Sequence, residues 1–177
     1  PIGLSISVPF CAAHCLFCDR VVHAAQPAEV IDAYVDALAD EAALIGARIG
    51  SGREVLQLHL GSGTANELSE SQLIRLMGAL ERHWRLPQDA EMSVECDPRR
   101  VSRRHLQVLR SLGFRSVSFG VVDLDVEVQQ SIGRRNSAAL VDDVCGEARE
   151  AGVENIRLEL MIGLPQQSPV RWRSTLD

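Results

Sequence analysis

Short apolar runs alternate with longer amphipathic segments along the whole of this chain. Five runs have the length and composition of β-strands, at residues 4–8, 55–60, 92–95, 117–121 and 156–162. Between them, apolar residues recur at helical spacing over residues 29–49, 69–84, 102–112 and 138–151, with a shorter helical turn at 126–132. Strict alternation of this kind predicts an α/β fold in which a parallel sheet is built through right-handed crossovers.

Capping residues mark several of the helix boundaries. Ser69 and Gln72 have the spacing of a capping box, and Ser102 stands at the N-cap position of the next helix. Gly113 and Gly152 follow the ends of two helices, where a glycine commonly closes the last turn. These signals place helix ends independently of the apolar periodicity.

The number of strands predicts an open sheet. Five strand–helix units are encoded, and a further helix begins near Trp172, where the chain ends. We therefore expect an open, partial parallel (β/α) barrel of five to six strands, with an exposed strand edge beside residues 156–162.

At 177 residues the chain should form one domain with its own core. Its first residue is Pro rather than Met, which indicates a trimmed chain or a fragment.

Charge and hydropathy argue against two classes of partner. The formal net charge is −6 and no long basic run occurs, which speaks against a nucleic-acid-binding protein. No apolar run approaches the ~20 residues that a membrane-spanning helix needs. We expect a cytoplasmic protein with no membrane span.

Three cysteines follow the first predicted strand within eight residues. Cys11, Cys15 and Cys18 have C-x3-C-x2-C spacing, with Phe17 before the last of them. Three thiolates on one loop can hold three irons of a [4Fe-4S] cluster, which ordinarily takes four cysteine ligands. The fourth iron would then be open to a substrate or cofactor, and S-adenosylmethionine (SAM) can chelate it through its amino and carboxylate groups.

Zinc and disulfides are the competing explanations for these thiols. Zinc could take the three cysteines with His14 or His23 as fourth ligand, although structural zinc sites usually show two paired half-sites. Five cysteines are an odd number for a disulfide framework. Cys96 and Cys145 are expected to be small buried core residues. A cluster with one open iron is the preferred interpretation.

The C-terminal ends of the other predicted strands also carry residues suited to ligand binding. They are the turn Gly61-Ser62-Gly63-Thr64, the segment Glu95-Cys96-Asp97-Pro98, Gly120, and the turn Gly163-Leu164-Pro165. In parallel α/β folds, sites form at this edge of the sheet, so these features predict one site shared with the cysteine loop. The glycines could instead serve only tight packing, and His59 is expected to be a structural histidine.

Five ordered motifs resemble one enzyme family over nearly the whole chain. They are Pro9-Phe10-Cys11 through Cys18, His59 through Ala65, Glu95 through Arg99, Gly120 through Asp123 with Gln129 and Arg134, and Glu159 through Pro165. In this order they resemble the radical SAM half of oxygen-independent coproporphyrinogen III dehydrogenases. The resemblance implies a radical SAM core domain at 1–177 with a partial radical SAM barrel, and absence of the family's C-terminal substrate domain.

The resemblance also implies a reaction and its cofactors. In that family a [4Fe-4S] cluster reduces SAM to a 5′-deoxyadenosyl radical, which abstracts hydrogen from a propionate side chain of coproporphyrinogen III. Oxidative decarboxylation then leaves a vinyl group, as a step of porphyrin and haem biosynthesis. An iron–sulfur oxidoreductase of this kind would act on a tetrapyrrole and take electrons from a donor such as flavodoxin or ferredoxin.

The resemblance assigns the family's cluster-binding and SAM-binding positions to individual residues of this chain. The implied ligands are Cys11, Cys15 and Cys18 for the cluster; Gly61, Ser62, Gly63 and Thr64 for the methionine part of SAM; and Glu95, Arg134 and Glu159 for its carboxylate and ribose. No residue is assigned a catalytic role in the chemical step.

Several positions depart from the family pattern and leave the substrate open. Asp19-Arg20 stands where the family has a fourth cysteine close behind the triplet, and Ser62 replaces a glycine. Val122 replaces a glutamine that faces SAM in the family, so it should contribute only an apolar wall. The alternatives are a radical SAM methyltransferase or haem-utilisation relative, and a non-enzymatic haem chaperone or degenerate paralogue.

Overall fold

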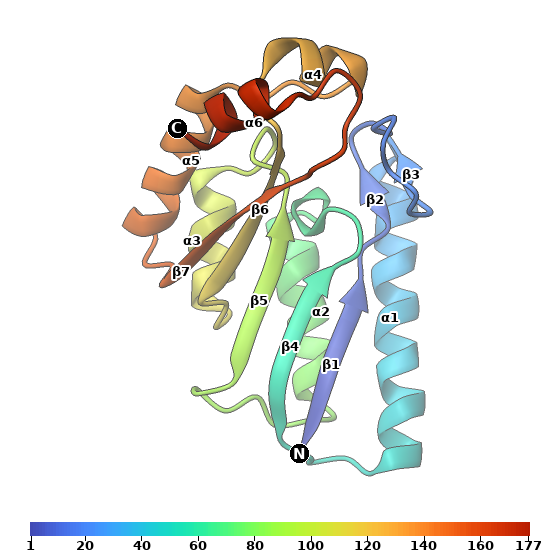
Figure 1. Ribbon diagram of the computed structural model, residues 1–177. Coiled ribbons are helices and arrows are strands. Elements are labelled where there is room, and N and C mark those ends of the chain that lie inside the picture. The colour runs from blue at the N-terminus through green and yellow to red at the C-terminus, as the bar shows by residue number, and fades with distance from the viewer.

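The computed structural model describes residues 1–177, and its centre is a five-stranded, wholly parallel sheet in the order β1-β4-β5-β6-β7 (Figure 1). The strands are β1 (Ile2–Ser7), β4 (Val55–Gly61), β5 (Glu91–Cys96), β6 (Ser116–Val122) and β7 (Asn155–Leu160). The helices are α1 (Ala28–Ile49), α2 (Glu70–Glu81), α3 (Arg103–Ser111), α4 (Val126–Ser131), α5 (Ala138–Glu150) and α6 (Pro169–Leu176), with a 3-10 turn η1 (Ala65–Glu67). The predicted open α/β sheet is confirmed.

All five predicted strands are present, and only their ends differ from the prediction. β1 begins and ends earlier than expected, so Val8 lies beyond the strand, where it is fully buried. β7 ends at Leu160 rather than at residue 162. Met161 and Ile162 extend the apolar pattern in the sequence, but they lie after the strand, and the Ile162 side chain is exposed.

The capping residues behave as the sequence predicts. Ser69 Oγ accepts a hydrogen bond from Gln72 N at 3.3 Å, and Gln72 Oε1 accepts one from Ser69 N at 2.8 Å, which completes the capping box of α2. Ser102 Oγ accepts from His105 N at 3.1 Å at the start of α3. Gly113 follows α3 with φ +100°, a conformation that glycine adopts without strain.

A second, two-stranded parallel ladder pairs β2 (Phe10–Cys11) with β3 (His23–Ala24), and nothing in the sequence predicts it. Two residues per strand carry no detectable periodicity. The ladder joins the two ends of the cysteine loop, where His23 N donates to Pro9 O at 2.7 Å and Ala25 N donates to Cys11 O at 2.9 Å. Phe10 anchors the ladder in the core, with its ring packed edge-on against Tyr34.

The sheet is apolar on one face and polar on the other. Its helix-facing side chains belong to the main core, among them Leu58, Leu60, Met92, Val94, Val117 and Phe119. The opposite face carries one polar row across all five strands, formed by Ser5, His59, Ser93, Ser116 and Asn155. Parallel sheets are normally covered on both faces and have continuous apolar strands. Here α1, α2, α3 and α5 contribute to a single core on one face, and the polar face is left open.

The two outer strands of the sheet, β1 and β7, each have a free edge. The edge beside β7 is exposed as predicted, and the Leu158 side chain on this strand is 48% exposed. None of the helices is both long enough and apolar enough to cross a membrane.

Substitutions at two adjacent residues of β4, Leu58 and Gln57, test whether only one face of the sheet is buried. Leu58 is fully buried against the helices, whereas Gln57 is exposed on the open face and bonds to Glu91. Leu58→Ala should lower the free energy of unfolding by about 2–5 kcal/mol, because it removes buried methyl groups and leaves a cavity. Gln57→Ala, the control, should lower it by less than about 1 kcal/mol. Urea unfolding followed by circular dichroism measures both, and equal losses would contradict a one-sided core.

Candidate functional site

A cavity of about 270 Å³ lies at the C-terminal ends of the strands. Its lining includes eight of the ten predicted site residues: Cys11, Cys15, Cys18, Gly63, Thr64, Glu95, Arg134 and Glu159. The other two, Gly61 and Ser62, belong to the same turn as Gly63 but lie outside the lining. Residues from distant parts of the chain therefore meet at one space, as the strand-end argument predicts.

The three thiols of the cysteine loop are free, and all of them line the cavity. Cys11 Sγ lies 3.3 Å from Thr64 Oγ1, at the end of the neighbouring strand. Burial raises the pKa of the Cys11 thiol, the hydrogen bond with Thr64 opposes that rise, and the charges of Cys18 and Cys15 add to it. The thiols therefore share one electrostatic environment, in which a bound metal centre would favour their thiolate forms.

The three thiols lie at separate positions around the cavity. No group of three or more His, Cys, Asp or Glu side chains is gathered closely enough to hold one ion. Of the two histidines considered as a fourth ligand for zinc, His14 lines the cavity and His23 does not. A [4Fe-4S] cluster takes each thiolate at a separate iron, which three thiols around a cavity can supply. Arg134 lines the same cavity, and its buried Nε has no hydrogen-bond partner, so it remains a donor for a ligand.

The other two cysteines lie in the hydrophobic core, as predicted. Burial raises the pKa of both the Cys96 and the Cys145 thiol. Cys145 lies on α5, outside the cavity lining, whereas Cys96 lines the cavity from the end of β5, apart from the cysteine loop.

The turn of residues 61–64 is glycine-rich because its neighbours approach closely. A Cβ atom on Gly63 would lie 2.0 Å from the Val8 carbonyl oxygen, and one on Gly61 would lie 2.4 Å from His59 Nε2. Ser62 has φ +62°, in the left-handed region that glycine favours. Tight packing against backbone therefore accounts for Gly63, which is the alternative explanation raised by the sequence, whereas the neighbours of Gly61 are the ends of side chains. Thr64 and Gly63 are the members of the turn that face the cavity.

Glu95 at the end of β5 already has three neighbouring donors. Its Oε2 accepts from Ser62 N at 3.2 Å and from Arg20 Nη1 at 3.4 Å, and its Oε1 lies 3.5 Å from His59 Nε2. His59 Nδ1 also lies 2.9 Å from Ser93 Oγ, so both ring nitrogens have a neighbour within the protein. The sequence analysis did not assign Arg20, which is 75 residues from Glu95 in the chain.

A buried ion network that the sequence analysis also missed borders the cavity. Asp97 accepts from Arg99 Nε at 2.9 Å, and its Oδ1 lies 3.4 Å from Arg134 Nη2. The Arg134 and Asp97 side chains are only 9% and 8% exposed. Arg134 also donates to the Gly120 carbonyl and, through Nη1, to Cys15 Sγ at 3.6 Å. The sequence does contain a sign of this network. The motif from Glu95 to Arg99 places an acidic residue, Asp97, two positions before a basic one, Arg99.

Val122 lies at an irregular point of β6. The pairing with β7 shifts register between Gly120 and Val122, and Val122 has φ +74°, a strained conformation for a β-branched residue. Its side chain lines the cavity and packs in a small apolar cluster with Val128, Ile132 and Leu164. It forms an apolar part of the wall, as the replacement of glutamine by valine suggests.

Asp97→Asn tests the buried network. Burial by itself raises the pKa of Asp97, but hydrogen bonds from Arg99 and the charge of Arg134 outweigh it and hold the pKa below its usual value. A depressed pKa in the folded state adds stability above the unfolded pKa of about 3.9, and this stability is lost as the pH falls through the folded pKa.

The variant should therefore lower the free energy of unfolding at neutral pH by about 3–5 kcal/mol, because it leaves the buried guanidinium of Arg134 and the partly buried one of Arg99 without their acid. Urea unfolding across a pH series measures the difference from wild type. That difference should shrink as the pH falls below about 4, and a difference independent of pH would contradict the assigned ion network.

Comparisons with known proteins agree with this geometry. A sequence profile of the radical SAM superfamily matches residues 5–177. Oxygen-independent coproporphyrinogen III oxidases from Synechocystis sp. and Escherichia coli are 34% and 36% identical to this chain, each over 176 residues. In both alignments 99% of this chain is covered but only 38% of the relative. The chain thus spans less than half the length of these curated relatives.

Solved structures show the same likeness. Coproporphyrinogen III oxidase (HemN) from Escherichia coli, described as a radical SAM enzyme, matches 99% of this chain with TM-score 0.93 and 35% identity, over 40% of its own length. The radical SAM methyltransferase TsrM from Kitasatospora setae covers 98% of this chain and 33% of its own, with TM-score 0.63 and 16% identity, which shows a shared fold alone. Because the superfamily profile matches nearly the whole sequence, the chain belongs to the radical SAM superfamily.

Proposed function

We propose that this chain is the radical SAM core of an oxygen-independent coproporphyrinogen III oxidase-like enzyme. It would generate a 5′-deoxyadenosyl radical that starts oxidative decarboxylation of a tetrapyrrole propionate, in porphyrin biosynthesis. The observation that carries the proposal is the cavity at the strand ends, where three free thiols meet Thr64, Glu95 and Arg134. The names of the relatives, 33–36% identical over the whole chain, support the substrate class.

Cys11, Cys15 and Cys18 would hold the cluster, and the fourth iron would receive SAM. A reduced [4Fe-4S] cluster bound there supplies the electron that splits the sulfonium of SAM. Glu95 would accept a hydrogen bond from the cofactor, and Arg134 would offer its unpartnered Nε, while Glu159 at the end of β7 completes the polar wall. Holding the cofactor in one orientation within a cavity limits side reactions with water.

The proposed enzyme has a small-molecule substrate and a protein electron donor. The substrate is a propionate-bearing tetrapyrrole, and the donor is a flavodoxin or ferredoxin. Free thiols that must stay reduced fit a reducing compartment, so we place the enzyme in the cytoplasm. Residues 1–177 act as the radical SAM core, and the relatives have further chain that this sequence does not match.

Cys11→Ala tests the cluster assignment, with Cys145→Ala as a matched thiol control. After anaerobic reconstitution with iron and sulfide, wild type and Cys145→Ala should show the brown absorption of an iron–sulfur cluster. With SAM and dithionite, both should release 5′-deoxyadenosine, which chromatography detects. Cys11→Ala should lose the absorption and the product. Loss of the cluster in Cys145→Ala would overturn the three-ligand assignment. A cluster without 5′-deoxyadenosine in wild type would favour the haem-chaperone alternative.

Glu95→Ala separates SAM binding from cluster binding. Glu95 is not a thiol ligand, so the cluster absorption should remain. Loss of a hydrogen bond to a charged group costs roughly 1.5–3 kcal/mol, so the dissociation constant for SAM should rise about tenfold or more. Calorimetry on reconstituted protein measures it, and an unchanged constant would remove Glu95 from the cofactor site.

A further inference from the structure

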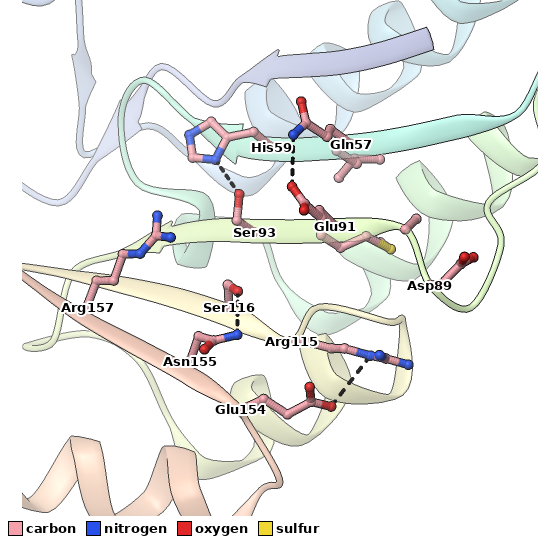
Figure 2. Close-up of a pocket in the computed structure, with 13 residues that line it drawn as sticks. Gln57, His59, Asp89, Glu91, Ser93, Arg115, Ser116, Glu154, Asn155 and Arg157 are labelled. Atoms are coloured by element: carbon pink, nitrogen blue, oxygen red, sulfur yellow. Dashed lines mark hydrogen bonds and ion pairs between the residues drawn. The ribbon is translucent and has the colours of Figure 1, made fainter. Parts of the chain in front are cut away.

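A second cavity, of about 510 Å³, lies on the open polar face of the sheet, toward the N-terminal ends of the strands (Figure 2). Only three of its 13 lining residues are hydrophobic, so the cavity is suited to a polar ligand. The lining comes from β4, β5, β6 and β7 and the segments that precede the last three. None of the predicted site residues belongs to it.

Most polar side chains of this cavity satisfy one another. Gln57 Nε2 donates to Glu91 Oε2 at 2.8 Å, and Asn155 Nδ2 donates to Ser116 Oγ at 3.3 Å. Arg115 Nε lies 3.5 Å from Glu154 Oε1, so its charge is compensated. Figure 2 draws these contacts as dashed lines, together with the one between His59 and Ser93.

Arg157 is the exception among the cations of the lining. The structure gives its guanidinium no hydrogen bond and no ion pair, and Figure 2 shows it on the side of the cavity where Ser93 and His59 lie. Asp89 lies at the opposite side of the view, the Glu91 carboxylate is bonded to Gln57, and Glu154 is paired with Arg115. An uncompensated guanidinium therefore marks one end of a polar cavity.

Strand register places Arg157 level with the candidate cofactor cavity. Arg157 pairs with Ser118 on β6, and Ser118 pairs with Glu95 on β5. Neighbouring strands are about 4.8 Å apart, so Arg157 and Glu95 stand roughly 10 Å apart with only a serine between them. On the sheet surface itself, a ligand that extends from Glu95 to Arg157 therefore crosses a single serine, Ser118.

We propose that Arg157 binds a carboxylate of the substrate and that the second cavity is the part of the active site that receives it. The proposal rests on the function proposed above, in which the substrate carries several propionates. A guanidinium offers a planar fork of donors that matches a carboxylate. One propionate held at Arg157 leaves another directed toward Glu95 and the cofactor cavity, and such remote contacts orient the reacting group.

The test compares two porphyrins with the same ring, one with charged and one with uncharged side chains. Coproporphyrin III is an air-stable tetracarboxylic acid, and its tetramethyl ester is the uncharged control. Fluorescence titration of reconstituted wild-type protein should show tighter binding of the acid. Arg157→Gln should weaken binding of the acid about tenfold, which corresponds to one charged hydrogen-bonding contact, and leave binding of the ester unchanged. Arg157→Lys keeps the charge without the planar fork of donors, so its affinity for the acid should lie between that of wild type and that of Arg157→Gln.

Arg82→Gln is the matched control, because it removes the same charge from an exposed arginine at the end of α2. It should leave the affinity for the acid within about twofold of wild type. Equal weakening by Arg82→Gln and Arg157→Gln, equal loss of acid and ester, or no preference of wild type for the acid would each overturn the proposal. Release of 5′-deoxyadenosine by wild type without any porphyrin tests the proposed function separately, so the two failures are distinguishable.

Discussion

One-sided burial of a parallel sheet is the constraint on which the site depends. Leu58, Val94 and Phe119 turn toward the helices and close the main core, while the alternate residues on the same strands include glutamine, histidine, glutamate and serine. Covering these polar groups with apolar helices would cost the desolvation of every unpaired donor and acceptor. A closed (β/α) barrel fills its interior with branched apolar side chains. Here the face of the sheet away from the helices is lined by polar side chains instead.

The elements and the cysteine triplet could be predicted because they depend on local sequence. The apolar period, the Ser69–Gln72 box and the spacing of the thiols each involve residues close together in the chain. The contacts that shape the site are long-range. Arg20 reaches Glu95 across 75 residues and Arg134 reaches Asp97 across 37, and both contacts depend on how loops lie once the strands have paired. Register, which a sequence pattern leaves open, decides that Arg157 is level with Glu95.

The glycine turn shows how packing and binding can rely on the same residues. Because Gly63 has no side chain, the turn lies against the end of β1, where Thr64 N donates to Phe10 O at 3.0 Å and Val8 N donates to Gly61 O at 2.8 Å. That contact brings Thr64 Oγ1 to the Cys11 thiol. A glycine that is needed for packing therefore also sets the distance between the cysteine loop and the next strand. Tight packing and ligand binding, the two explanations for the glycine turn, are thus linked.

The short ladder between β2 and β3 has a consequence for the entropy of ligand binding. It ties residue 11 to residue 24, and Leu16 N also donates to Ile132 O at 3.1 Å, so the segment between is held at both ends and near its middle. The conformational entropy lost when such a loop is closed grows with the logarithm of the loop length. A loop that is already closed does not lose this entropy a second time. The backbone contacts of this segment restrict it as well, so they share that entropic cost with any ligand that the thiols hold.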